Sequence, residues 1–349
     1  MKINLVLILP FILLLSCKNH SEKGKSLTEE GKEVLVRNAH AMAYNSKDSE
    51  VYFFGGANDK EVLSDLWVLD GQRWRKIVTA RTPKPRTFAS LIYDSENDRL
   101  VLFGGSKVLF GQGPDSQNLL NDTWQFSNNR WKKLITDNAP SPRAETVMVF
   151  DKSRNTIVLF GGYKIQNGEY IKLKDTWEFH HNDWHLVSAD GPSERHGVSM
   201  AYHTEDKSVI LFGGSTIDKQ YGKSKGETWK WNGKEWNKLE IEQPTGMFNA
   251  TMVYHEEQRE LIRFGGWDGK SRVDQTWSFR DNKWDMLAID YSPTSRNHSA
   301  MVYDEKEKRI VLFGGHDGEQ VFGDIWEYTN MEWRKISESE PVKRKNNGH

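Results

Sequence analysis

Short apolar runs separated by polar turns fill most of this chain, and they recur in a fixed order. In the last repeat, an alternating segment at 298–303 is followed by the polar turn 304–308 and the continuous apolar run 309–313. Two further short segments follow at 324–328 and 332–336. Alternating runs bounded by turn residues are typical of β-strands, and a continuously apolar run suits a strand buried on both faces. Each repeat is therefore predicted to form four antiparallel strands, called A to D.

A pair of adjacent glycines ends the continuous apolar run of every repeat. The pairs are Gly55-Gly56, Gly104-Gly105, Gly161-Gly162, Gly213-Gly214, Gly265-Gly266 and Gly314-Gly315, with spacings of 49, 57, 52, 52 and 49 residues. Two tryptophans seven residues apart follow each pair, at Trp67/Trp74, Trp124/Trp131, Trp177/Trp184, Trp229/Trp236, Trp277/Trp284 and Trp326/Trp333. A period near 50 residues with glycine and aromatic marks predicts a β-propeller with one repeat per blade. We expect the paired tryptophans to pack between blades.

These marks resemble the Kelch family. The shared features are the glycine pair at the end of strand B, an Asp-x-Trp that opens strand C, and the tryptophan of strand D. The aspartate is present as Asp65, Asp122, Asp175 and Asp324, and is replaced by Glu227 in blade 4 and Gln275 in blade 5. The resemblance covers residues 37–336 and implies an all-β fold, a six-bladed Kelch-type β-propeller with four antiparallel strands per blade.

The N-terminal residues predict export rather than a folded element. Lys2 precedes an almost unbroken apolar run from Ile3 to Leu15, which is too short to span a bilayer but suits the core of a signal peptide. The run ends in Leu-Leu-Ser-Cys, which resembles the lipobox of bacterial lipoproteins and implies lipidation of Cys17. The alternative is an ordinary secretory signal with an incidental cysteine. Lys18 follows the cysteine in place of the aspartate that often signals inner-membrane retention, so the outer membrane is favoured.

The expected organisation has four parts. Residues 1–17 form the lipoprotein signal, 18–36 a flexible tether, 37–337 the propeller and 338–349 a polar tail. We expect an exported monomer that is lipid-anchored to the bacterial cell envelope.

Composition excludes several classes of function. The chain carries 48 basic and 49 acidic residues, so it has no electrostatic footprint for nucleic acid. Cys17 is the sole cysteine, which excludes intrachain disulfides and the tyrosine–cysteine copper cofactor of galactose oxidase, another Kelch protein. No nucleophile, phosphate-loop or dinucleotide motif occurs. We therefore expect no cofactor and no metal.

Candidate ligand-binding residues converge on one face. Antiparallel order places the D–A and B–C connections together, and we call this face the mouth. An arginine lies seven residues before the aromatic residue of strand A in five repeats, at Arg37, Arg86, Arg143, Arg195 and Arg296, whereas blade 5 has Met247. By resemblance to Kelch adaptors of ubiquitin ligases, these arginines could clasp acidic groups at the mouth. The alternative is that each pairs with a neighbouring aspartate or carbonyl and joins the blades.

Other candidates lie beside the glycine pairs. Tyr163, Trp267 and His316 each follow a pair directly, and the two aromatic residues could stack on a sugar ring. The B–C loops of blades 2, 3 and 4 have 16, 12 and 12 residues against eight in the others, so they could form a raised wall. Arg263 interrupts the apolar strand B of blade 5, where either the channel or a carboxylate would have to compensate its charge.

Two functions remain open. The first is a binding or scaffold module for a protein or glycan partner, because the repeats are regular and catalytic sites usually break a repeat. The second is a carbohydrate-active enzyme, such as a sialic-acid-type sugar epimerase or mutarotase, with an acid or base drawn from His196, His298, Glu145 or Arg263 in the channel.

Overall fold

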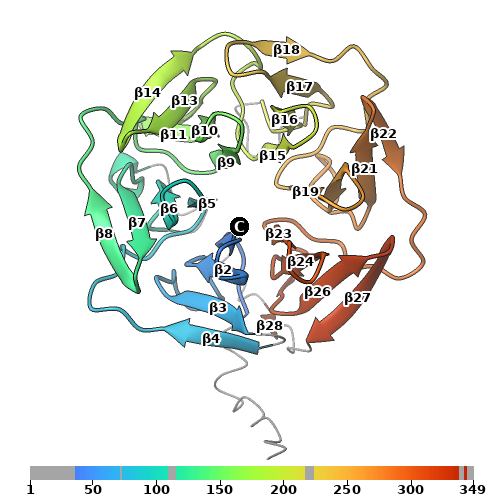
Figure 1. The fold of residues 1–349 in the computed structure, drawn as a ribbon, viewed down its shortest axis with the longest axis horizontal. Coiled ribbons are helices and arrows are strands. Elements are labelled where there is room, and N and C mark those ends of the chain that lie inside the picture. The colour runs from blue at the N-terminus through green and yellow to red at the C-terminus, as the bar shows by residue number, and fades with distance from the viewer. Residues whose placement is uncertain (1–35, 71–72, 109–114, 217–223, 338–341, 344–349) are drawn as a thin grey trace, which may run out of the picture.

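The structure is a computed structural model that describes residues 36–70, 73–108, 115–216, 224–337 and 342–343. Six four-stranded antiparallel sheets stand around a central axis, each with strand A innermost and strand D outermost (Figure 1). The predicted six-bladed propeller is confirmed. Cys17 and the proposed tether up to residue 35 lie outside the described residues.

Each blade is built from one continuous stretch of sequence. The first three blades contain β1 (Ala41–Asn45), β2 (Glu50–Phe54), β3 (Leu66–Asp70) and β4 (Arg73–Ile77); β5 (Ser90–Asp94), β6 (Arg99–Phe103), β7 (Thr123–Ser127) and β8 (Arg130–Leu134); β9 (Val147–Asp151), β10 (Thr156–Phe160), β13 (Thr176–His180) and β14 (Asp183–Ser188). The last three contain β15 (Ser199–His203), β16 (Ser208–Phe212), β17 (Thr228–Trp231) and β18 (Trp236–Lys238); β19 (Thr251–His255), β20 (Glu260–Phe264), β21 (Thr276–Arg280) and β22 (Lys283–Met286); β23 (Ala300–Asp304), β24 (Arg309–Phe313), β26 (Ile325–Thr329) and β27 (Glu332–Ser337).

The remaining elements lie in the B–C loops, apart from one short strand that follows blade 6. Blade 3 has a hairpin of β11 (Tyr163–Gln166) and β12 (Glu169–Lys172), and blade 2 has the 3-10 helix η1 (Ser116–Asn118). In blade 6, β25 (Gln320–Val321) pairs with β28 (Val342–Lys343). Much of the predicted wall falls at 109–114 and 217–223, outside the described residues. In the part of the chain that the structure describes, no helix is long and apolar enough to cross a membrane.

The ring closes where blade 6 meets blade 1, without exchange of a strand. The N–H of Arg37 donates to the carbonyl of Phe322 at 3.0 Å, and the N–H of Gly315 donates to the carbonyl of Arg37 at 2.9 Å. Below them, Phe53 of blade 1 stacks on Phe313 of blade 6, with ring centroids 4.9 Å apart. One shared apolar core thus covers the faces of both terminal blades.

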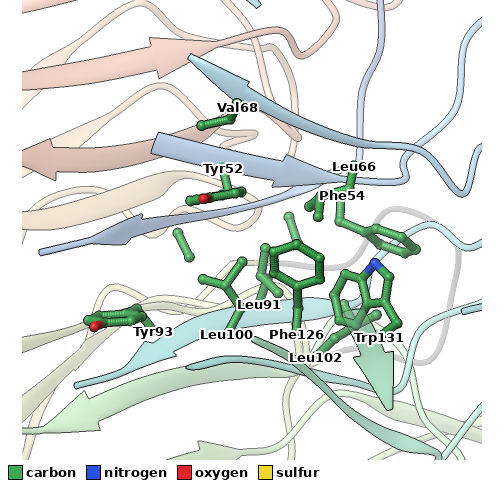
Figure 2. Close-up of a cluster of buried hydrophobic side chains, with 12 residues drawn as sticks. Tyr52, Phe54, Leu66, Val68, Leu91, Tyr93, Leu100, Leu102, Phe126 and Trp131 are labelled. Atoms are coloured by element: carbon green, nitrogen blue, oxygen red, sulfur yellow. The ribbon is translucent and has the colours of Figure 1, made fainter. Parts of the chain in front are cut away.

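Apolar clusters fill the spaces between neighbouring blades, as the tryptophan repeat predicts. Between blades 1 and 2, Phe54 meets Trp131 edge to face at 5.2 Å, and Phe126 packs on the same indole (Figure 2). These large rings are buried between two neighbouring blades. They contribute much of the apolar contact that a single blade could not make by itself.

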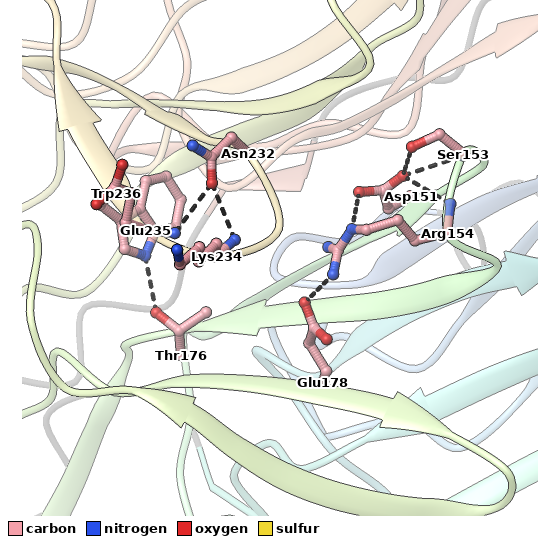
Figure 3. A network of polar contacts seen from close by, with 9 residues as sticks. All are labelled: Asp151, Ser153, Arg154, Thr176, Glu178, Asn232, Lys234, Glu235 and Trp236. Carbon is pink, nitrogen blue, oxygen red and sulfur yellow. Dashed lines mark hydrogen bonds and ion pairs between the residues drawn. The ribbon is translucent and has the colours of Figure 1, made fainter.

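In blades 3 to 6, the tryptophan of strand D also forms a hydrogen bond to the preceding blade. Trp236 Nε1 donates to Thr176 Oγ1 at 2.8 Å, which joins blade 4 to blade 3 (Figure 3). Three further pairs share this geometry: Trp184–Thr123, Trp284–Thr228 and Trp333–Thr276. The threonine therefore fixes the distance between outer strands and satisfies a buried indole N–H.

Candidate functional site

The five arginines of the D–A loops are buried inside the blades. Arg143 is 1% exposed, and its Nη1 and Nη2 donate to Asp175 Oδ1 and Oδ2 at 2.8 and 2.7 Å. Nη1 also donates to the carbonyl of Gly161 at 3.1 Å. Burial would raise the pKa of Asp175, but hydrogen bonds and charge from Arg143 lower it overall. The equivalent pairs are Arg37–Asp65, Arg86–Asp122, Arg195–Glu227 and Arg296–Asp324.

Each arginine joins two blades. The carbonyl of Arg86 accepts a hydrogen bond from the N–H of Gly56 in blade 1, whereas its side chain donates to the carbonyl of Gly104 in blade 2. Gly55 has a φ of +65°, and a Cβ there would lie 2.7 Å from the carbonyl oxygen of Arg86. The glycine pair is thus required by this close approach. The arginines therefore pair with carboxylates and carbonyls and join the blades, which is the second of the two roles considered from the sequence. Their guanidinium groups do not face the mouth.

A closed ring of backbone hydrogen bonds surrounds the channel at the mouth. It is formed by the residue two places after each arginine position, and we call these six residues the collar: Ala39, Phe88, Glu145, Gly197, Asn249 and His298. The N–H of each donates to the carbonyl of the collar residue in the preceding blade, at 2.7–3.3 Å. All six have φ between 50° and 63°. Positive φ at non-glycine residues is uncommon and marks a constrained backbone.

A polar cluster sits on the collar, where blades 3, 4 and 5 depart from the repeat. Glu145 Oε2 lies 2.5 Å from His196 Nδ1, and both side chains are largely covered. Burial would raise the pKa of Glu145, but the charge of His196 and hydrogen bonds from His196 and Asn249 lower it below its usual range. A Cβ on Gly197 would meet Asn249 Oδ1 at 2.2 Å and Glu145 Oε2 at 3.2 Å. Only glycine therefore leaves room for these side chains at the collar.

Two more histidines extend the cluster toward blade 6. His298 Nε2 lies 3.9 Å from Glu145 Oε1, and its Nδ1 is 2.9 Å from Nε2 of His316. Because the side chains of His196 and His298 keep 12% and 15% of their surface exposed, a ligand at the mouth can reach them. The buried Tyr163 packs edge-on against His196 at 5.7 Å.

The aromatic candidates behave differently from each other. Tyr163 is 3% exposed, and burial raises its pKa well above the usual value. Trp267 is partly exposed, and the guanidinium of Arg272 lies 4.8 Å over its ring. Arg272 Nε donates to Asn297 Oδ1 at 3.0 Å, which holds the arginine in place. Of these two candidates, Trp267 is thus the one whose side chain stays partly exposed, with Arg272 over its ring.

Arg263 lies neither in the channel nor beside a carboxylate. It is 1% exposed between blades 4 and 5, and its Nε and Nη1 have no hydrogen-bond partner. Its guanidinium is 4.9 Å from the ring of Phe212 and 5.8 Å from Trp277 and Trp284. Burial lowers its pKa to about 9, so it remains charged at neutral pH. Among the described residues, neither the channel nor a carboxylate compensates the charge of Arg263, although one of the two was expected from the sequence. The faces of three aromatic rings surround the guanidinium instead.

Comparisons with known proteins agree with this geometry. The profile of the KLHDC2/KLHL20/DRC7 Kelch-repeats domain matches residues 12–191 and 152–349. The chain belongs to the Kelch-repeat family. Kelch propellers generally mediate protein interactions, and the fold suggests a binding or scaffold module.

Relatives of the Kelch propeller occur in larger proteins. Mei4-dependent protein 6 of Schizosaccharomyces pombe is 24% identical over 54% of this chain and 30% of its own length. Dynein regulatory complex subunit 7 of Chlamydomonas reinhardtii is 32% identical over 37% of this chain and 11% of its own length. An F-box/kelch-repeat protein of Arabidopsis thaliana is 28% identical over 57% of this chain and 43% of its own length. The chain thus spans less than half the length of these relatives.

A solved structure shares the fold. The structure of YjhT superposes with a TM-score of 0.65 at 15% identity, covering 86% of this chain and 97% of that one. Within the described part of the Kelch propeller, no three His, Cys, Asp or Glu side chains are grouped to hold a metal ion.

Sequence reasoning named most members of the polar cluster, but for separate reasons. Glu145, His196 and His298 were expected as channel acids or bases, and His316 as a loop residue. The collar and Arg272 were missed. A usable signal existed, since the position two after each arginine position is polar in blades 3, 5 and 6, as Glu145, Asn249 and His298, whereas blades 1, 2 and 4 have Ala39, Phe88 and Gly197.

Proposed function

We propose that this Kelch propeller is an envelope-anchored binding module that takes a glycan at the mouth. The observation that carries the proposal is the polar cluster on the collar. Glu145 supplies an acceptor, His196 and Asn249 supply further polar groups, and Trp267 supplies an aromatic face. Sites that combine an aromatic surface with a few placed polar groups suit ligands that are both hydroxylated and partly apolar.

The Glu145→Gln variant is expected to bind its glycan about 10–100-fold more weakly, because a charged acceptor becomes a neutral amide. We would screen the soluble protein from residue 18 on a glycan array and measure the hits by calorimetry. Glu169→Gln is the matched control, since Glu169 is exposed on the β11–β12 hairpin of the mouth. Equal affinity in the Glu145 variant, with an unchanged melting temperature, would contradict the proposal, as would an array without hits.

A sugar mutarotase or epimerase is the second candidate, supported by the 2.5 Å contact between Glu145 and His196. Such a pair can move a proton to or from a sugar hydroxyl by general acid–base catalysis. The same samples distinguish the two functions. Anomer exchange of sialic acid, followed by magnetization-transfer NMR, stays at the buffer rate for a binding module and rises with protein concentration for an enzyme.

The anchor is proposed from Cys17 and its lipobox. In a bacterial host fed an alkyne fatty acid, we expect the full chain to be labelled and to partition into detergent, because acyl chains confer durable membrane attachment. Cys17→Ser should lose the label, and Ser16→Ala should keep it. An unlabelled wild-type chain in the aqueous phase would overturn the anchor but leave the glycan proposal standing.

A further inference from the structure

The central channel contains a cavity that opens on the face opposite the mouth. Its volume is ≈ 370 Å³, and all six A strands line it. The lining starts at the residues that directly follow the collar and ends at the first residue of each A–B turn: Ser46, Ser95, Lys152, Thr204, Glu256 and Glu305. We call these six residues the rim. The collar lies at the inner end of the cavity, and the half-exposed rim lies at the open end.

The walls of the cavity are suited to a hydrocarbon. Strand A is the inner edge of every sheet, and small or branched apolar side chains such as Ile92, Val149 and Val253 line the space between the collar and the rim. A partly enclosed surface with such side chains favours a ligand that carries apolar surface of its own.

The rim already holds one ammonium group. Lys152 reaches from the turn of blade 3 across the opening, and its Nζ lies 3.1 Å from Glu256 Oε1 and 3.3 Å from Glu305 Oε1. Those carboxylates belong to blades 5 and 6. Burial would lower the pKa of Lys152, but the two carboxylates raise it overall. Two carboxylates face one lysine, so the rim keeps an excess negative charge.

We propose that this cavity is a second ligand site, for a small molecule with one ammonium group and a hydrocarbon body. The ammonium takes the place of Lys152 Nζ between Glu256 and Glu305, and the hydrocarbon enters the channel. Lys152 can give way because its side chain is 49% exposed. Exposed and half-exposed ion pairs are weak, so a ligand that adds apolar burial can displace the lysine.

The test is calorimetry with octylammonium and octanoate, which share a chain and differ in charge. Octylammonium is expected to bind the wild-type propeller. Lys152→Met should bind it at least about fivefold tighter, because the carboxylates no longer have a competing partner. The double variant Glu256→Gln/Glu305→Gln should bind it at least about tenfold more weakly.

A neighbouring ion pair supplies the controls. Lys308 Nζ and Glu257 Oε1 lie 2.8 Å apart on the same face but do not line the cavity. Lys308→Met and Glu257→Gln should therefore leave the affinity unchanged. Melting temperatures establish that each variant is folded. Tighter binding of octanoate than of octylammonium, or no binding to folded Lys152→Met, would overturn the proposal.

Discussion

Replacing Arg296 by methionine is expected to lower the free energy of unfolding by about 3–5 kcal/mol, because the partner carboxylate is left buried and unpaired. Arg296 is fully buried, and its Nη1 and Nη2 donate to Asp324 Oδ1 and Oδ2 at 2.6 and 3.1 Å. Nη1 also donates to the carbonyl of Gly314. The loss would appear as a lower midpoint of urea unfolding.

Blade 5 supplies the control for this prediction. It carries Met247 and Gln275 where blade 6 has the charged pair, so the natural chain already contains a neutral version. The double variant Arg296→Met/Asp324→Gln is therefore expected to recover at least half of the stability lost in the single variant. Buried ion pairs can be exchanged for neutral groups at small cost, whereas a single unpaired charge cannot. Equal losses in both variants would show that Arg296 acts through packing on Phe322, which it approaches to 4.1 Å.

The second large effect has the opposite sign. Arg263→Leu is expected to stabilise the propeller by about 1–4 kcal/mol, because the variant removes a buried charge that no carboxylate among the described residues neutralises. The gain is reduced by the lost attraction to Phe212, Trp277 and Trp284. Leucine occupies this position in four other blades, so the site can accept its shape. Calorimetric melting and urea unfolding both measure the change.

The opposite substitution, of a strand B leucine by arginine, is expected to destabilise the fold, and the position of the neighbouring cation explains why. In blade 1, the guanidinium of Arg37 lies 4.4 Å over Phe53, so the D–A loop provides the charge and strand B the apolar side chain. Blade 5 inverts this arrangement with Met247 and Arg263. Leu312→Arg in blade 6 would place a second cation beside Arg296 and should strongly destabilise the fold. A destabilised Arg263→Leu variant would contradict our account and show that the guanidinium has a favourable role.

The local order of apolar and polar residues was sufficient to predict the strands of each blade. In the last repeat, strand B was predicted at 309–313 and observed as Arg309–Phe313, because the four residues that follow Arg309 are apolar and buried. Asn128 and Asn129, in the turn between strands C and D of blade 2, have φ of 49° and 56°, which asparagine tolerates better than most residues. Strand A began later than predicted, since the residues before Ala300 belong to the collar and the D–A loop.

The sequence by itself determined the number of blades, their strand order and their Kelch marks, because these depend on spacing within about 50 residues. Tertiary structure alone decided which role each polar side chain has. Arg143 meets Asp175 after 32 residues, Glu145 meets His298 after 153, and Lys152 reaches Glu305 across the opening of the channel. The periodic pattern is the same for an arginine facing solvent and one facing a buried carboxylate. Only the folded, closed ring brings the blades together and decides which of these two roles an arginine has.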